Sequence, residues 1–310
     1  MKILYICPNF DNKTYSYYGM IPDGLKKLNY NVNCIKKLND FNILDKYDVI
    51  IFGYRGFNKN LFNKKFKNNL KIYNLLGAQS SEEFKNKGIA LNNNDNIINL
   101  TSMVALDLLK KKFFNNLKAF PYSFYPDLYK DYGLEKIYDI GMSGALHGAN
   151  KYPDDAYLED ERNIRERIKD RLDLLKTKYK IFIQSSDVFS TSRIVTDLDY
   201  AKTINSSKIW IATNSAYTDI PSRHFQIPSC KTLLFCNEQN HDEFKKIFKD
   251  KINCVYFKNN LSDLEEKINF YLTNKNEYNK IVEYGFKEFH EKHTNIERAK
   301  QLIEIIKKNI

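Results

Sequence analysis

Residues 214–236, NSAYTDIPSRHFQIPSCKTLLFC, predict a polar loop, a short helix and a buried strand in succession. Pro221 suits the first turn of the helix, because its missing N–H is not needed there and its fixed φ fits the helix. Arg223 and Gln226 lie three residues apart and therefore share one face of the helix, whereas Phe225 points elsewhere, toward the core. The segment thus predicts an α/β unit with polar side chains at the start of its helix.

The start of this helix also predicts an anion-binding site. The first turn of a helix has unpaired N–H groups and a partial positive charge. An arginine in that turn, here Arg223, adds a planar fork of hydrogen-bond donors. Together these groups favour a diphosphate as the ligand.

Short apolar runs recur along the whole chain, with room for a helix between most of them. This spacing predicts parallel sheets with helical crossovers. The runs are residues 2–7, 32–35, 48–52, 72–76, 137–142, 179–184, 209–213, 231–236 and 253–257. Further helices are expected at 21–28, at 102–111 and within 160–178, where Ile164, Ile168, Leu172 and Leu175 form one stripe.

Residues 119–127, AFPYSFYPD, interrupt this pattern with two prolines, and no helix or central strand is expected to continue through them. We therefore predict a hinge there, between an N-terminal domain of residues 1–125 and a C-terminal domain of residues 126–290. Residues 291–310 form a last helix, which begins at a capping box from Thr294 to Glu297.

The second half of the chain resembles a known family. The motif from Pro221 to Gln226, followed by a small-residue turn and an apolar strand, is similar to the C-terminal domain of group 1 glycosyltransferases, in the branch similar to the spore-maturation protein CgeB. The same order continues with an acidic helix at 242–248, a strand at 252–257, the segment LSDLEEKI at 261–268, a turn at Tyr284 and Gly285, and His293, Thr294 and Arg298.

This resemblance implies the GT-B fold, which has two Rossmann-like α/β domains that face each other across a cleft. It also implies transfer of a sugar from a nucleoside-diphosphate sugar, with a UDP-sugar as the first guess, to a glycan, protein or small-molecule acceptor. The first domain would bind the acceptor, the second would bind the nucleotide sugar, and the last helix would cross back to the first domain. The retaining branch needs no enzymic base; an inverting enzyme would need one, for which Asp11 and Glu82 are guesses.

The expected site residues follow from the motif and from the glycine turn after Met142, which lies where an open α/β sheet places its ligands. Arg223 is the expected catalytic residue, because it would stabilise charge on the leaving diphosphate without a metal ion. Acceptor contacts are expected from Asp11 and Gly19. Donor contacts are expected from Ser143, Gly144, Ser185, Tyr217, Thr218, Asp219, Ile220, Ser222 and Gln226.

Gln226 departs from the family pattern, which has Glu at this position, where the acid typically bonds the ribose of the donor. The departure leaves a second class of function open, a non-catalytic module that binds a sugar nucleotide or a glycan. Donor hydrolysis would separate the two.

The amino-acid composition narrows the class of protein to which the chain can belong. Hydrophobic residues make up 43% of 310 residues, which indicates a globular protein with room for two domains. No apolar run approaches a membrane span, and the start MKILYICPNF leads into a polar segment, so we expect a cytoplasmic protein, with peripheral membrane contact left open. The five widely spaced cysteines favour buried free thiols.

The net charge of +11 suits an anionic partner, and nucleic acid is a third, less favoured class of ligand. Lysine and asparagine are spread along the chain, which favours a compositional bias over a basic patch. Asp197 and Asp199 spell the DxD motif of metal-dependent glycosyltransferases, but acids in the first turn of a helix are the simpler interpretation, so no metal site is expected. Of the five histidines, only His147, after the glycine turn, merits a functional test.

Overall fold

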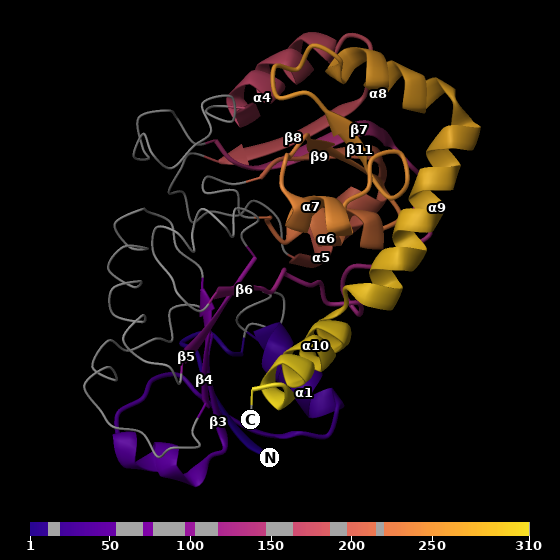
Figure 1. Ribbon diagram of the computed structural model, residues 1–310. Helices are drawn as coiled ribbons and strands as arrows, with labels where there is room; N and C mark the ends of the chain where they lie inside the picture. Colours follow the sequence, from indigo (N-terminus) through magenta and orange to yellow (C-terminus); the bar gives the residue numbers. More distant parts are fainter. Residues whose placement is uncertain are drawn as a thin grey trace. The chain divides into compact units, whose positions relative to one another are not determined.

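The computed structural model describes residues 1–11, 19–53, 71–76, 97–102, 117–146, 164–186, 197–214 and 220–309, and the structural statements below concern these residues. The chain divides into two compact units (Figure 1). Unit 1 consists of Met1–Tyr125 and Lys292–Ile310, and unit 2 of Pro126–Glu291.

Unit 1 is built on a parallel sheet of six strands in the order β2-β1-β3-β4-β5-β6. The strands are β1 (Lys2–Ile6), β2 (Asn31–Ile35), β3 (Val49–Phe52), β4 (Lys71–Leu76), β5 (Ile97–Thr101) and β6 (Leu117–Ala119). The first four match the predicted apolar runs within two residues, whereas β5 and β6 were not predicted. Five residues of β5 are buried, among them Asn99, whose Oδ1 accepts a hydrogen bond from Asn74 Nδ2 at 3.2 Å.

Helices α1 (Ile21–Lys27) and α10 (Asn295–Lys307) pack together in unit 1, which also contains the 3₁₀ helix η2 (Phe41–Lys46). A Cβ on Gly24 would lie 2.5 Å from the carbonyl oxygen of Asn295, so only glycine permits this close approach. Thr294 caps α10, because its side chain accepts from the N–H of Glu297 at 3.3 Å, as the capping motif predicted. The buried face of α10 contributes Ala299, Leu302, Ile303 and Ile306 to the core of unit 1.

Backbone hydrogen bonds join the two chain segments of unit 1 near their ends. Phe124 donates to the carbonyl oxygen of His293 at 3.3 Å, and Asn295 donates to that of Phe124 at 3.0 Å. The buried guanidinium of Arg298 donates to the carbonyl oxygen of Tyr122 at 2.9 Å and lies beside His293 Nδ1. The C-terminal segment is therefore part of unit 1, although 166 residues separate it from Tyr125.

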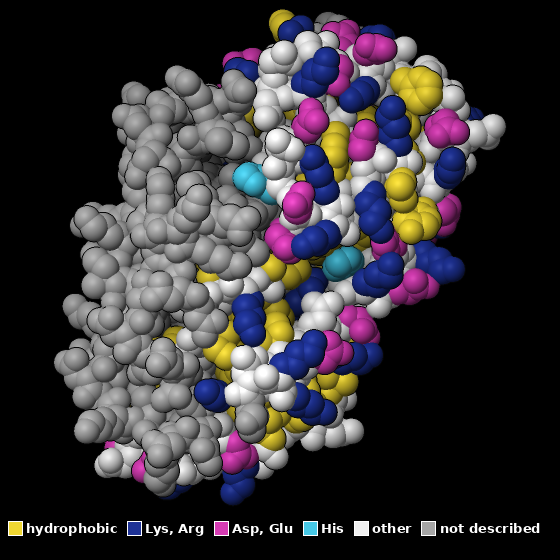
Figure 2. Space-filling view, in the orientation of Figure 1, with side chains coloured by type: hydrophobic (Ala, Val, Ile, Leu, Met, Phe, Trp, Pro, Cys, Tyr) yellow, Lys and Arg dark blue, Asp and Glu magenta, His cyan; other side chains and the backbone are white. Residues whose placement is uncertain are grey.

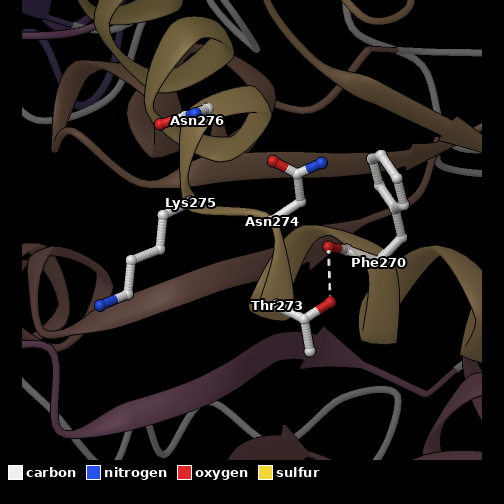
Figure 3. A pocket seen from close by; sticks show the side chains of 5 residues that line it. All are labelled: Phe270, Thr273, Asn274, Lys275 and Asn276. Carbon is white, nitrogen blue, oxygen red and sulfur yellow. Dashed lines mark hydrogen bonds between the residues drawn. The ribbon is translucent and has the colours of Figure 1, made fainter.

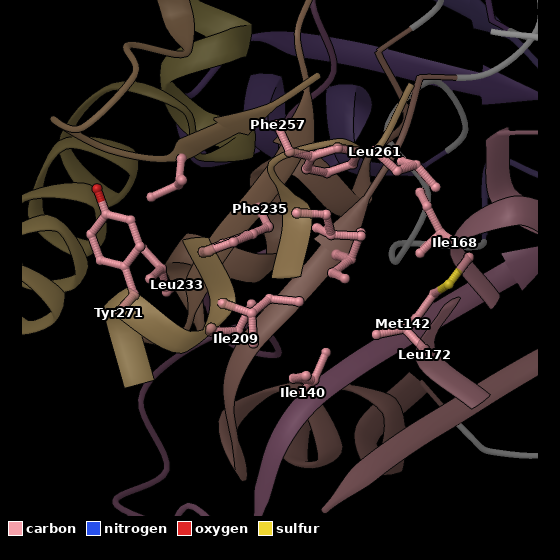
Figure 4. Packing of buried hydrophobic residues seen from close by; sticks show 14 of the residues in the cluster. Ile140, Met142, Ile168, Leu172, Ile209, Leu233, Phe235, Phe257, Leu261 and Tyr271 are labelled. Carbon is pink, nitrogen blue, oxygen red and sulfur yellow. The ribbon is translucent and has the colours of Figure 1, made fainter. Parts of the chain in front are cut away.

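Unit 2 is built on a parallel sheet of five strands in the order β11-β10-β9-β7-β8. The strands are β7 (Tyr138–Ala145), β8 (Ile181–Ser186), β9 (Ser207–Ala212), β10 (Leu233–Asn237) and β11 (Val255–Phe257). Figure 4 shows the apolar core on one face of this sheet, where side chains such as Ile140, Ile209 and Phe235 meet Ile168 and Leu172 of a covering helix. The predicted alternation of strand and helix is present from β7 to β11 in unit 2 and, among the described residues of unit 1, from β1 through α1 to β2.

The helices of unit 2 are α4 (Ile164–Leu175), α5 (Asp197–Asn205), α6 (Arg223–Ser229), α7 (Asp242–Ile247), α8 (Leu264–Thr273) and α9 (Lys275–Lys292). The predicted stripe on α4 is confirmed, because all four of its apolar residues are buried. Helix α6 begins two residues later than predicted, because Pro221 lies in a preceding turn in which its carbonyl oxygen accepts from His224 N at 3.0 Å. The helix predicted at 102–111 lies almost wholly outside the described residues.

Two further expectations concern the cysteines and the membrane. All five cysteines are free thiols; Cys7, Cys230, Cys236 and Cys254 are buried and Cys34 is partly buried. Among the described helices, none combines the length and the hydropathy that a membrane span requires.

The two units differ in net charge. Unit 1 has 24 lysines and arginines against 11 aspartates and glutamates, a net charge of +13, whereas unit 2 has 25 against 27, a net charge of −2. Basic residues are thus spread evenly, and the asymmetry comes from a shortage of acids in unit 1. Figure 2 shows basic and acidic side chains interspersed over the described part of one face, so the asymmetry is not a single patch on that face.

His224 on α6 is an unusual member of the core of unit 2. Its ring is fully buried, lies edge-on to Phe244 and Phe248 at centroid distances of 6.1 and 5.4 Å, and has no hydrogen-bond partner at either nitrogen. Burial, reinforced by the nearby charges of Arg223 and Arg165, lowers the pKa of His224 to about 3. The imidazole is therefore neutral in the folded protein at any pH near neutrality.

We predict that this histidine makes the stability of unit 2 depend on pH. The unfolded chain takes up a proton near pH 6.5 and the folded chain only near pH 3, so stability is full above pH 6.5 and falls as the pH drops through this window. The loss is about 1.4 kcal/mol per pH unit. His224→Phe should remove it, so that the stability difference between wild type and variant changes by about 2 kcal/mol between pH 7.5 and pH 5.

Urea unfolding followed by the fluorescence of Trp210, the single tryptophan, measures this change in unit 2. Phe244→Leu is the matched control, since it alters the same aromatic cluster without removing a titratable group. An equal pH dependence in wild type and His224→Phe would contradict the assignment.

Candidate functional site

The polar residues named in the sequence gather at the carboxyl edge of the sheet of unit 2. Ser143 and Gly144 are among the last three residues of β7, and Ser185 is the last residue but one of β8. Helix α6 leads into β10. Ser185 is opposite Gly144 in the register of the parallel pair. Open α/β sheets bind their ligands at this edge, where the strands end and the helices begin.

Arg223 contacts the end of β7 directly. One of its terminal nitrogens donates to the carbonyl oxygen of Ser143. Gly144 has φ of +133°, a conformation that L residues rarely adopt, and a Cβ there would lie 3.0 Å from Cζ of Arg223. The glycine therefore admits the guanidinium against the backbone, and two separately predicted motifs form one site.

Tyr200 on α5 is a neighbour of this site that the sequence did not indicate. Its hydroxyl lies 3.0 Å from Ser143 Oγ, and its ring packs edge-on against Trp210 at a centroid distance of 5.8 Å. This contact fixes the side chain of Ser143, which is 8% exposed.

Arg165 on α4 is a second arginine that the sequence did not indicate. It is 7% exposed, and its Nε donates to Thr213 Oγ1 at 2.8 Å. Its Nη2 lies 3.4 Å from the carbonyl oxygen of Thr213 and 3.3 Å from that of Asn214. Burial is the main cause of the lowered pKa of His224, and the charges of Arg223 and Arg165 lower it further. The two cations therefore lie near the same end of α6.

Asparagines link the ends of three neighbouring strands at the same edge. Asn237, the last residue of β10, accepts from Asn214 N through its Oδ1 at 3.2 Å. Its Nδ2 donates to Asn259 Oδ1, beyond β11, at 3.0 Å. The carboxyl ends of β9, β10 and β11 are thereby held in register by amide groups.

The remaining donor candidates are placed as follows. Gln226 is 6% exposed and Ile220 is 1% exposed. Both are therefore buried, Gln226 within α6 and Ile220 just before it. Ser222 precedes α6 as its N-cap residue but makes no side-chain capping bond. Tyr217, Thr218 and Asp219 lie outside the described residues.

The two acceptor candidates belong to unit 1. Asp11 is exposed after β1 and forms an ion pair with Lys36 Nζ at 3.1 Å, whereas Gly19 is buried in the short π-helical segment directly before α1. Glu82 lies outside the described residues.

The DxD motif, Asp197 and Asp199, lies at the start of a helix. Asp197 and Asp199 lie in the first turn of α5, as the interpretation of acids complementing a helix dipole predicted. Within the described ranges no group of three or more His, Cys, Asp or Glu side chains is placed to hold a metal ion. His147 lies outside these ranges.

A hollow on the surface of unit 2 lies away from these residues. It is lined by Phe270, Thr273, Asn274, Lys275 and Asn276 at the junction of α8 and α9 (Figure 3). Helix α8 follows β11 and runs back along the sheet, so this junction belongs to the amino edge. The candidate site therefore stays at the carboxyl edge, where Arg223 contacts the Ser143–Gly144 backbone and Arg165 binds the carbonyl oxygens that follow β9.

Comparison with solved structures identifies the fold. The chain is similar to HepE from Anabaena in complex with UDP and glucose, with 10% identity, a TM-score of 0.60 and 99% of each chain covered. Sucrose-phosphate synthase from Thermosynechococcus elongatus gives 8% identity, a TM-score of 0.64 and 99% of each chain. A glycosyltransferase from Rickettsia africae has 13% identity and a TM-score of 0.54, and the match covers 99% of this chain and 98% of that one. No curated protein matches the sequence.

These similarities confirm the predicted fold class, because the two Rossmann-like parallel sheets match those of GT-B glycosyltransferases. A family model described as glycosyl transferase-like matches residues 143–304, which is more than half of the 310 residues and begins at Ser143 of the site. The chain therefore belongs to the glycosyl transferase-like family.

Proposed function

We propose that this protein is a glycosyltransferase that moves a sugar from a nucleoside-diphosphate sugar to an acceptor. The observation that carries the proposal is the contact of Arg223 with the Ser143–Gly144 backbone at the carboxyl edge of unit 2. A guanidinium beside a glycine backbone provides charge and close access for a diphosphate. In this proposal unit 2 binds the donor and unit 1 binds the acceptor.

The chemistry assigned to this site is stabilisation of a leaving group. The bond between the sugar carbon and the diphosphate oxygen breaks, and its electron pair stays on the diphosphate. The oxygen of an acceptor hydroxyl forms the new bond to the sugar carbon, and its proton passes to the departing diphosphate. Arg223 acts on the charge that grows on the diphosphate, and such preorganised groups contribute more to the transition state than to the bound substrate.

The donor is proposed to be a UDP-sugar. HepE has been solved with UDP-glucose, and the pneumococcal O-GlcNAc transferase GtfA with UDP and GlcNAc. These ligands belong to proteins with 11% and 9% identity to this chain, so they supply the first probes to test. Glucose and N-acetylglucosamine are the corresponding sugars.

The finer assignments extend the resemblance to group 1 glycosyltransferases. We propose membership of the CgeB-like branch, retention of configuration and independence from divalent metal. Tyr217, Thr218, Asp219, Ile220, Ser222, Ser185 and Gln226 remain proposed donor contacts, and Asp11 and Gly19 remain proposed acceptor contacts.

Gln226 favours one alternative, a module of the same fold that binds a sugar nucleotide or a glycan without transferring the sugar. Glutamine at this position keeps hydrogen-bonding capacity toward a ribose but removes the negative charge of the family's glutamate. Such a module would bind donor nucleotide and would show neither transfer nor donor hydrolysis.

We predict that Arg223→Ala lowers the rate of donor hydrolysis or transfer by roughly a hundredfold or more, or about 2–4 kcal/mol, because the variant loses donors aimed at the leaving group. Arg223→Lys keeps the charge but lacks the planar fork, so its rate should lie between those of the wild type and Arg223→Ala. Donor turnover with UDP-glucose and UDP-N-acetylglucosamine, with and without EDTA, measures the effect.

Thermal melting and titration calorimetry with UDP provide the control for this prediction. The variants should melt cooperatively near the wild-type temperature. Near wild-type turnover in Arg223→Ala would rule out its catalytic role and would leave it as a structural contact of Ser143. Gln226→Glu should keep or tighten nucleotide binding, and Gln226→Ala should weaken it.

A second prediction concerns Gly144. Alanine there would be strained at φ of +133° and would displace the guanidinium, so Gly144→Ala should weaken UDP binding at least tenfold. Gly133→Ala is the matched control in the same unit, because Gly133 also has positive φ, +66°, but has no atom within 4 Å of its Cβ position. If the two variants bind UDP equally well, the displacement of Arg223 is not what matters.

A further inference from the structure

Asn214 is a buried polar residue whose side chain lacks a protein partner. It follows β9 and is 6% exposed, and neither Nδ2 nor Oδ1 has a hydrogen-bond partner or measurable exposure. A polar group buried in this way destabilises the folded state. Native proteins rarely keep such a group unless it serves another purpose.

The backbone around Asn214 is fixed on both sides. Its N–H donates to Asn237 Oδ1 at 3.2 Å, and its carbonyl oxygen accepts from Arg165 Nη2 at 3.3 Å. Arg165 also holds the preceding residue through Thr213 Oγ1. The carboxamide is thus presented from a rigid position, which is how binding groups are preorganised.

Asn214 also belongs to the same edge as the donor contacts. β9 lies between β7, which carries Ser143 and Gly144 near its end, and β10, which follows α6. Arg165, which holds Asn214, is close enough to His224 to lower its pKa, and His224 is the neighbour of Arg223. Asn214, through the bond from Arg165 to its carbonyl oxygen, thus lies beside a charge that reaches the start of α6.

We propose that Asn214 is a donor-recognising residue, whose carboxamide pairs with a polar group of the nucleotide sugar, and that Arg165 is its positioning residue. The proposal rests on the proposed function. A carboxamide presents an acceptor and a donor side by side, so it fits a group that presents the complementary pair, such as the N3–H and O4 of uracil or two hydroxyls of a sugar.

The test exploits the opposite effects that the substitution should have on stability and on binding. Asn214→Leu keeps the size of the side chain and removes both unpartnered polar atoms. The free protein should melt at the wild-type temperature or above it, whereas the Kd for the nucleotide should rise tenfold or more. Equal losses with UDP and with UDP-glucose assign the contact to the nucleotide, and a loss with UDP-glucose alone assigns it to the sugar.

Trp210→Phe is the matched control, because it removes another unpartnered polar atom, Nε1, from β9. It should leave the Kd for UDP and UDP-glucose unchanged. If Asn214→Leu likewise leaves both Kd values unchanged while wild type binds, the inference is wrong and the proposed function stands. If wild type binds no nucleotide sugar, the proposed function fails and the inference falls with it.

A double-mutant cycle tests the positioning role of Arg165. Arg165→Lys keeps the charge but lacks the fork that reaches both Thr213 and Asn214, so it should weaken UDP binding in the wild-type background. In the Asn214→Leu background it should have little further effect, because the group that it positions is gone. Additive losses in the cycle would overturn the positioning role, since a purely structural arginine would affect both backgrounds equally.

Discussion

The contact between the Arg223 guanidinium and the backbone of Gly144 determines the geometry of the site in unit 2. The arginine begins α6 and the glycine is the last residue but one of β7, so the contact joins a helix and a strand through residues 79 positions apart. It requires a residue without Cβ at 144 and a planar, permanently charged side chain at 223. Ser143 and Tyr200 then pack around this pair, and Ser185 occupies the neighbouring strand.

The same edge contains groups whose burial opposes folding. His224 is neutral and unpartnered within an aromatic cluster, Asn214 has an unpartnered amide, and Arg165 is almost fully buried among carbonyl oxygens. The core on the sheet face, by contrast, is apolar and closely packed (Figure 4). Stability therefore comes from the sheet face, while polar groups that contribute little to folding collect where the strands end. This separation is expected of proteins in which strained or unsatisfied groups serve a site.

The sequence predicted features that depend on neighbours in the chain. The stripe on α4, the cap at Thr294 and the acids of α5 are local patterns, and each was confirmed. Strand β5 was missed because a buried Asn99 interrupts its apolar run, and only its partner Asn74 on β4 explains the amide. Arg165 was missed because a charged residue on an amphipathic helix normally faces solvent, and its partners lie 48 and 49 residues further on. The contact of Gly144 with Arg223 was likewise beyond prediction, although both residues were named.

The unequal charge of the two units affects how ligands arrive. Long-range attraction acts on a diffusing anion before any specific contact forms, and it is weakened by salt. With a net charge of +13, unit 1 attracts anions from a distance, whereas the net charge of −2 on unit 2 contributes almost no such attraction. Under the proposed function, capture of a donor by unit 2 would depend on short-range encounters with the buried Arg165 and the partly buried Arg223. Association of an anion with unit 1 is instead expected to be fast and sensitive to ionic strength.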